Sequence, residues 1–145
     1  MKLNKTLKSI IGWIVYLVIL VGLVYGTPKV LTYALDTDYP MASITSGSMW
    51  PSLKKGDLVL IKGIGSKEEV QMGDIIVYQN PKGFTIHRVI RINNNTLVTK
   101  GDANNTEDEP IKYDKIIGKT LTINDNPLRI PFFGKIGILI SKGRM

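Results

Sequence analysis

The hydrophobic positions form two different patterns along the chain. From Ser9 to Pro28 no residue is charged, and apolar side chains would occupy every face of a helix. After Pro40 the apolar positions come in short runs, rich in β-branched residues and separated by Gly, Pro, Asn and Asp. The chain therefore divides into an apolar N-terminal segment and a β-rich domain.

The apolar segment is long enough to cross a membrane. As a helix, residues 9–28 would cover about 30 Å, which matches the hydrocarbon thickness of a bilayer. Lys2, Lys5 and Lys8 precede the segment, so the positive-inside rule predicts a cytoplasmic N-terminus and a domain on the extracytoplasmic or lumenal side. A cleavable signal peptide is the alternative, with Gly26 near the cut. We favour the anchor because the run exceeds the usual signal core.

The pattern predicts one folded domain with flanking segments. Residues 1–8 form the cytoplasmic N-terminus and 9–28 the anchor, which ends at Pro28 because proline interrupts a helix. Residues 29–40 form a polar linker, and 41–130 form the domain. Residues 131–145 combine apolar and basic positions and are too short to span a membrane. An edge strand, a segment covering the core and a membrane-surface segment all remain open for this last part.

Within the domain the runs predict a small, mainly antiparallel sheet. Strands are expected at 57–62, 75–79, 84–92, 96–100 and 116–123, with turns between them. His87 lies on the strand 84–92 and shares a face with Thr85, Val89 and Arg91. The short turn 93–95 predicts an antiparallel return that brings the acidic loop 102–108 to the same end of the sheet as His87.

Composition removes several classes of function. The chain has no cysteine, which excludes a cysteine peptidase, disulfides and zinc-thiolate sites. Its formal net charge is +7, but the lysines are scattered and form no basic cluster with interleaved aromatic residues, so we expect no nucleic-acid partner. Attraction of the chain to anionic lipid headgroups explains this positive charge better.

The candidate chemistry centres on a serine-rich turn. Ser46-Gly47-Ser48 is followed by Pro51, so Ser48 can sit exposed on a bend between a permissive glycine and a rigid exit. A serine hydroxyl is a poor nucleophile without a base to take its proton. His87 is the only histidine and is the natural base, while Asp102 and Asp108 are the two candidates to orient its imidazole.

These stretches together resemble the type I signal peptidases. The resemblance rests on three boxes after the first forty residues, which are Ser43 to Leu53, Phe84 to Val89 and Thr99 to Asp108. Gly73-Asp74 resembles a further family box. A histidine in the second box is typical of the branch found in the endoplasmic reticulum and archaea, and in some bacteria, whereas most bacterial members carry a lysine.

The resemblance implies a membrane-bound serine endopeptidase that removes signal peptides through an acyl-enzyme. Ser48 matches the nucleophile and His87 the general base. Asp108 matches the third catalytic member and Asp102 the supporting aspartate, and we favour Asp108 as the partner of His87. Ser46 matches a hydroxyl that assists the backbone N–H of Ser48 in binding the oxyanion. The fold implied is a small antiparallel β domain related to the self-cleaving domain of LexA-type repressors.

The resemblance also implies the partners. Substrates would be secretory preproteins with small residues at the first and third positions before the cut, bound as an added strand along an edge near Ser43 to Ser46. Subunits of the export machinery are further candidate partners, and no metal or cofactor is expected. Two alternatives remain: a processing peptidase with few substrates, and a catalytically silent, membrane-tethered β-domain that binds partners.

Overall fold

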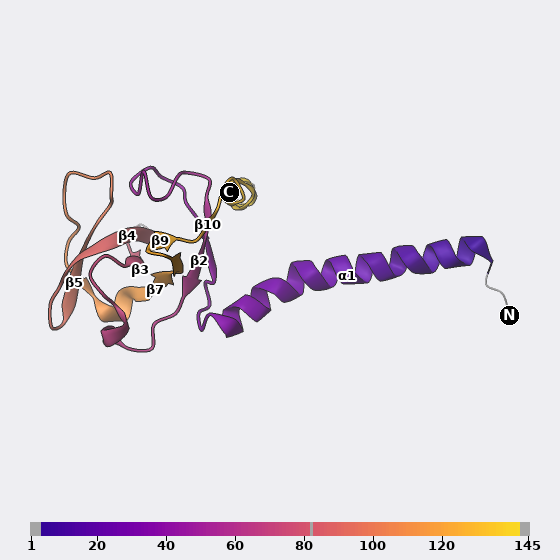
Figure 1. The fold of residues 1–145 in the computed structure, drawn as a ribbon, viewed down its shortest axis with the longest axis horizontal. Helices are drawn as coiled ribbons and strands as arrows, with labels where there is room; N and C mark the ends of the chain where they lie inside the picture. The colour runs from indigo at the N-terminus through magenta and orange to yellow at the C-terminus, as the bar shows by residue number, and fades with distance from the viewer. Residues whose placement is uncertain (1–3, 82, 143–145) are drawn as a thin grey trace.

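A long helix projects from a small β domain in this protein (Figure 1). The computed structural model describes residues 4–81 and 83–142. Helix α1 spans Lys5–Ala34, and none of its residues is buried. A stretch of 18 residues within it has a mean hydropathy of 2.3, and the helix is long and apolar enough to cross a membrane. An N-terminal apolar helix followed by an antiparallel β domain is the fold class predicted from the sequence, and it is confirmed.

The prediction that the anchor helix ends at Pro28 is wrong. Pro28 lies inside α1, which continues to Ala34 and is followed by a Leu35 N–H that donates to the Leu31 carbonyl at 2.8 Å. Proline removes only one backbone donor, and apolar helices of membrane proteins tolerate that loss. At 1.5 Å per residue the 30 residues of α1 cover about 45 Å, so the helix is longer than the hydrocarbon core of a bilayer.

The domain is built on one antiparallel sheet with the strand order β1-β2-β7-β3-β4-β5-β6. Short strand β10 also pairs with β2, and β8 with β9 forms a separate hairpin. The strands are β1 (Met41–Ser43), β2 (Leu58–Lys62), β3 (Ile75–Asn80), β4 (Gly83–Ile92), β5 (Thr96–Lys100), β6 (Ile111–Lys112), β7 (Ile116–Thr120), β8 (Thr122–Ile123), β9 (Asn126–Pro127) and β10 (Arg129–Ile130). Two 3-10 turns, η1 (Lys67–Glu69) and η2 (Tyr113–Lys115), lie in the connections.

The structure agrees with most of the predicted strands and refines two of them. The predicted strand 116–123 is divided at Leu121 into β7, which pairs with β2 and β3, and β8, which pairs with β9. In β4 the pairing with β5 shifts between Val89 and Arg91. This bulge interrupts the strict alternation that placed Arg91 on the face of His87.

Two apolar clusters hold the sheet and the loops. One joins β3, β4 and β5 through buried residues that include Ile76, Val89 and Leu97. The other packs Ile44, Met49 and Leu53, from the connection between β1 and β2, against Val59 and Ile75. Truncation of one such side chain to alanine typically costs about 2–5 kcal/mol. The loop that carries Ser48 is therefore fixed by core packing.

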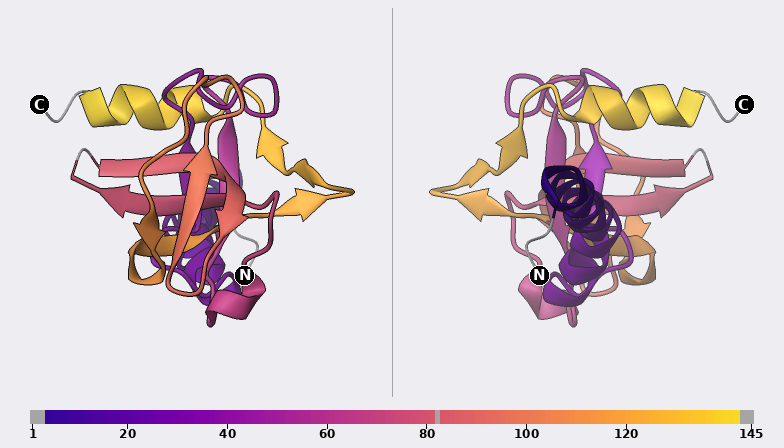
Figure 2. Two further views of the ribbon diagram at one scale, coloured as in Figure 1. Left: turned by 90° about the vertical axis from the view of Figure 1, so that its left-hand side faces the viewer. Right: turned by 90° about the vertical axis from the view of Figure 1, so that its right-hand side faces the viewer.

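The C-terminal segment forms a second helix. Helix α2 spans Gly134–Lys142 and contacts β1, so an edge strand over 131–145 is wrong for the part that the structure describes. Figures 1 and 2 show that α2 lies against the domain on the side from which α1 departs, with its axis across that of α1. The glycines at 134 and 137 allow this contact, because a Cβ on Gly134 would lie 2.3 Å from the Asp57 carbonyl oxygen.

Candidate active site

Ser48 lies on the connection between β1 and β2, on a tight turn. The Trp50 N–H donates to the Gly47 carbonyl at 3.0 Å, and the Leu53 N–H donates to the Met49 carbonyl at 2.8 Å. Met49 is 1% exposed, so the residue after Ser48 anchors the turn in the core. Gly47 has no positive φ, and a Cβ there would meet nothing within 4 Å. The bend itself therefore does not require a glycine.

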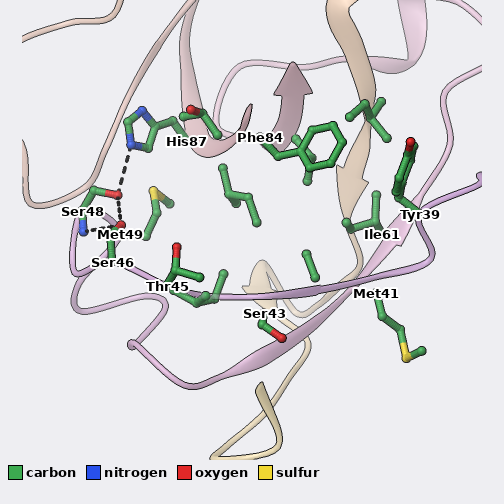
Figure 3. A pocket seen from close by; sticks show the side chains of 16 residues that line it. Tyr39, Met41, Ser43, Thr45, Ser46, Ser48, Met49, Ile61, Phe84 and His87 are labelled. Atoms are coloured by element: carbon green, nitrogen blue, oxygen red, sulfur yellow. Dashed lines mark hydrogen bonds between the residues drawn. The ribbon is translucent and has the colours of Figure 1, made fainter. Parts of the chain in front are cut away.

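Ser48, His87 and Asp108 form one chain of hydrogen bonds. The Ser48 Oγ lies 3.1 Å from His87 Nε2, and His87 Nδ1 lies 2.5 Å from Asp108 Oδ2. Figure 3 shows the first of these contacts at one end of a pocket. A carboxylate can only accept, so Nδ1 carries the proton and donates; in a neutral imidazole, Nε2 is then the nitrogen that accepts the serine proton. This is the tautomer that a general base requires.

The same oxygen of Asp108 receives two further hydrogen bonds. The Thr99 hydroxyl donates to Oδ2 at 2.6 Å and the Tyr78 hydroxyl at 3.3 Å. Thr99 is fully buried and Tyr78 is 5% exposed. Burial raises the pKa of Tyr78, which keeps its hydroxyl protonated as a donor. Three donors on one oxygen fix the carboxylate beneath the imidazole.

Asp102 makes no hydrogen bond to His87. Its two oxygens accept hydrogen bonds from Arg88 Nε at 2.8 Å and Nη2 at 2.7 Å. Arg88 also donates to the Gly73 carbonyl and to the Ser52 hydroxyl. Burial works to raise the pKa of the Asp102 carboxyl, but the hydrogen bonds from Arg88 and Ser52 and the electrostatic attraction of Arg88 and His87 outweigh it, so this pKa is lowered. Asp102 thus ties the acidic loop to β4 and to the serine loop.

The acidic loop also holds the backbone of Ser48. The Ala103 N–H donates to the Ser48 carbonyl at 2.8 Å. A Cβ on Gly101 would lie 2.7 Å from the same carbonyl oxygen, so only glycine allows this close approach. The loop 101–108 therefore positions both the serine and, through Asp108, the histidine.

Ser46 lies beside Ser48, with the two hydroxyl oxygens 3.1 Å apart. The Ser48 N–H points toward Ser46 Oγ at 3.5 Å. Two potential donors, this N–H and the Ser46 hydroxyl, therefore stand next to the oxygen of Ser48. A backbone N–H and a hydroxyl are donor types that stabilise negative charge on a carbonyl oxygen under attack.

The pocket next to Ser48 is a groove of about 500 Å³ between two strands. One wall is formed by residues 41–46 and the other by residues 84–87. Figure 3 shows that the groove extends from Ser48 and His87 to Tyr39 and Phe84, whose rings are 5.0 Å apart. Strand β1 pairs only with β2, and residues 83–87 of β4 pair only with β3, in the part of the chain that the structure describes. Each wall thus offers an unpaired strand edge.

Comparison with known proteins shows the family of this chain. Residues 27–121 match the Peptidase S24-like family model. The chain is 34% identical to the signal peptidase complex catalytic subunit SEC11 of Metarhizium acridum over 79% of this chain and 71% of that protein. It is 32% identical to the subunit of the same name from Lodderomyces elongisporus over 80% and 74%. The chain belongs to the type I signal peptidases, in their Ser-His branch of the endoplasmic reticulum type. It is a peptidase related to the enzymes that cleave signal peptides.

In this signal peptidase the residues singled out by sequence lie together, but in two groups. Ser46, Ser48, His87 and Asp108 are linked at one end of the groove, whereas Asp102 is joined to Arg88. Among the residues described, no group of three or more His, Asp or Glu side chains could hold a metal ion.

Sequence reasoning missed three residues that position these groups: Tyr78, Arg88 and Thr99. Arg88 stands next to His87, and its charge was a usable signal for a carboxylate partner. The sequence around Tyr78 and around Thr99 contains nothing that indicates a role in the site. Only the register of β3, β4 and β5 brings them to Asp108.

Proposed function

We propose that this signal peptidase is a membrane-bound serine endopeptidase in which Ser48 is the nucleophile and His87 the general base. The observation that carries the proposal is the hydrogen-bond chain from Ser48 Oγ through His87 to Asp108 Oδ2, at the end of a groove with two unpaired strand edges. A catalytically silent binding module has no need for an imidazole aligned between a serine and a carboxylate.

In the first half of the reaction, Ser48 Oγ attacks the carbonyl carbon before the cut, and its proton moves to His87 Nε2. The resulting imidazolium is stabilised by the Asp108 carboxylate. The C–N bond then breaks and the leaving amine takes the proton from Nε2. The Ser48 N–H and the Ser46 hydroxyl, which lie beside Ser48 Oγ, stabilise the oxyanion, and each such donor contributes about a hundredfold or more.

In the second half, water hydrolyses the acyl-enzyme. His87 Nε2 removes a proton from the water as its oxygen attacks the ester carbon, and Ser48 Oγ leaves and recovers the proton. The two halves use the same donors and the same base. No step calls for a metal or a cofactor.

The groove suits an extended peptide. A substrate strand can enter between β1 and residues 83–87 of β4 and make main-chain hydrogen bonds along the unpaired edges. Its side chains would alternate between pockets, which fits the expected preference for small residues at the first and third positions before the cut. Secretory preproteins are the substrate class that we propose, whether general or limited to a few.

Helix α1 is the proposed membrane anchor. Lysines precede its apolar part, which favours a cytoplasmic N-terminus and a catalytic domain on the extracytoplasmic or lumenal face. The fungal relatives are named as subunits of a signal peptidase complex, and we propose that export-machinery subunits are partners of this chain as well.

The test is cleavage of a preprotein by the detergent-solubilised full chain, compared with Ser48→Ala. We expect the wild type to release the mature protein with a new N-terminus at the signal junction, and the variant to release none. Activity should fall toward acid pH, because a protonated imidazole cannot accept the serine proton. Equal cleavage by Ser48→Ala would refute the assignment of the nucleophile.

A further inference from the structure

Two aromatic side chains stand at the end of the groove farthest from Ser48 (Figure 3). Tyr39 lies just before β1 and Phe84 lies in β4, so each wall of the groove contributes one ring. The ring centroids are 5.0 Å apart and the ring planes are inclined by 57°. Tyr39 is nevertheless 49% exposed and Phe84 54% exposed. The pair therefore leaves apolar ring surface open to a third side chain.

The backbone that carries the two rings is held by hydrogen bonds. On the side of β1, the Ile61 N–H donates to the Pro40 carbonyl at 2.9 Å, and Pro40 is buried. The Tyr39 N–H donates to Thr37 Oγ1 at 3.2 Å. On the other side, Phe84 lies in the uninterrupted pairing of β3 with β4. An apolar surface fixed in this way binds a peptide at a lower entropic cost than a mobile one.

The two walls of the groove run in the same direction. β1 pairs with β2, β2 with β7, β7 with β3 and β3 with β4, and each of these pairings is antiparallel. β1 and β4 are therefore parallel, and both run from the aromatic end of the groove toward Ser48 and His87. Under the proposed function, the residues before the cut lie in the groove and the last of them has its carbonyl at Ser48. A bound substrate thus runs in the direction of both walls.

The strand geometry decides which substrate residue reaches the rings. Phe84 precedes His87 by three residues, which is about 10 Å along a strand. Phe84 also shares a face of the sheet with Ile86, which lines the groove. In an extended substrate the first, third and fifth side chains before the cut point to one side, and the fifth lies about 13 Å from the first. When the first two of these point to the floor beside Ser48, the fifth meets Phe84 and Tyr39.

The two ends of the groove differ in the room that they leave. Near Ser48, Ile44 and Met49 are 4% and 1% exposed, and Ala42 and Ile86 pack against them. This floor is filled by its own side chains, which fits the small residues expected at the first and third positions before the cut. At the far end, the exposed rings offer apolar area that a larger side chain can cover, and covering apolar area favours binding.

We propose that Tyr39 and Phe84 form a specificity subsite for a large apolar side chain at the fifth position before the cut. The two rings add a preference for a leucine-sized side chain to the exclusion of large side chains at the first and third positions. The ability of the ring pair to bind an apolar side chain rests on its exposure and fixed backbone. The position of that side chain in the substrate rests on the proposed function.

The test uses the detergent-solubilised full chain and three water-soluble peptides that span a signal junction, all with alanine at the first and third positions before the cut. The first peptide has leucine at the fifth position and serine at the fourth. The second has these two residues exchanged, and the third has serine at both positions. We expect kcat/KM for the first peptide to exceed that for the third by about tenfold, and the second and third to be cleaved alike.

Variants assign this preference to the rings. Tyr39→Phe should keep the ratio of kcat/KM between the first and third peptides, because it keeps the ring. Tyr39→Ala and Phe84→Ala should each reduce the ratio to about twofold or less, and a general loss of activity cancels in the ratio. Phe133→Ala is the matched control. It removes a ring that is 59% exposed and does not line the groove, so it should keep the ratio of the wild type.

Two results of the cleavage assay would overturn the proposal. One is a wild type that shows no preference for leucine at the fifth position, or shows it at the fourth position instead. The other is a pair of alanine variants that lose activity equally on all three peptides and keep the ratio, because the rings would then only hold the walls of the groove together.

A binding measurement separates failure of the subsite from failure of the proposed function. Ser48→Ala is titrated calorimetrically with the first and third peptides, and we expect Kd to be about tenfold lower for the first. If the wild type cleaves neither peptide and Ser48→Ala shows this difference in Kd, the peptidase mechanism fails and the subsite stands. Equal Kd values for the two peptides would overturn the subsite, whether or not the wild type cleaves them.

Discussion

The two aspartates of the acidic loop make opposite predictions for the same chemical change. Asp108 accepts from His87 Nδ1 at 2.5 Å, while Asp102 accepts from Arg88 and makes no hydrogen bond to the histidine. Replacement of either by asparagine keeps the shape and removes the charge. Asp108→Asn should abolish most catalysis, and Asp102→Asn should not.

The magnitude follows from the charge that the imidazole gains in the transition state. The side chains of His87 and Asp108 are only 9% and 23% exposed, so water screens their attraction weakly. With charge centres about 4 Å apart and an effective dielectric constant near 20, the attraction is about 4 kcal/mol. One factor of ten in rate corresponds to about 1.4 kcal/mol, so kcat should fall by about a thousandfold with KM nearly unchanged.

The assay is cleavage of a preprotein at saturating concentration, with folding of each variant checked by thermal melting. Asp102→Asn is the matched control, since it alters the same loop and breaks the ion pair with Arg88. We expect it to lower the melting temperature but to keep kcat within about fivefold, the effect of about 1 kcal/mol. If Asp108→Asn keeps kcat within about tenfold, or if folded Asp102→Asn is equally inactive, the assignment of the two aspartates is refuted.

Three further predictions concern the residues around the site. Ser46→Ala should lower kcat by about a hundredfold if its hydroxyl binds the oxyanion, measured at a pH where wild type is fully active; an unchanged kcat would remove Ser46 from the mechanism. Tyr78→Phe removes a neutral donor to Asp108 and should cost about two- to tenfold in kcat, with a larger loss indicating a role beyond positioning. The lowered pKa of Asp102 contributes stability that is present above about pH 4, the value of an unfolded aspartate, and is lost as pH falls through the lower folded pKa. Melting temperatures measured from neutral to strongly acid pH should therefore fall less steeply for Asp102→Asn than for wild type, and parallel curves would contradict this.

Much of the fold could be predicted because its signals are local. The uncharged run and the β-branched runs between turn residues predict α1 and the central strands. The continuation of α1 past Pro28 could not be predicted in this way. It depends on whether the helix tolerates the loss of the one backbone hydrogen bond that Pro28 cannot donate. Helix α2 depends on two glycines that meet the backbone at Asp57 and the side chain of Ser43, which are remote in sequence.

The same distinction between local signals and contacts remote in sequence applies to the site. Ser48 and His87 stand out by residue type and motif, and the turn 93–95 predicts that the acidic loop returns to the His87 strand. Spacing alone does not decide between Asp102 and Asp108 as the partner of His87. The decision depends on Arg88, which binds Asp102. The register of the strands decides that Tyr78 and Thr99 lie on the same face of the sheet as His87. Ile76, two residues before Tyr78, pairs with His87, and Thr99 pairs with Val89, two residues after His87.

The serine mechanism is tested most sharply by capture of the covalent intermediate on Ser48. A peptide methyl ester that ends at a signal-peptide cleavage position acylates easily, so its acyl-enzyme should accumulate. After an acid quench, intact-mass analysis should show one added acyl group, located on the peptide fragment containing Ser48 and absent from Ser48→Ala and His87→Ala. An acyl group on another residue, or equal hydrolysis of the ester by wild type and Ser48→Ala, would contradict the mechanism.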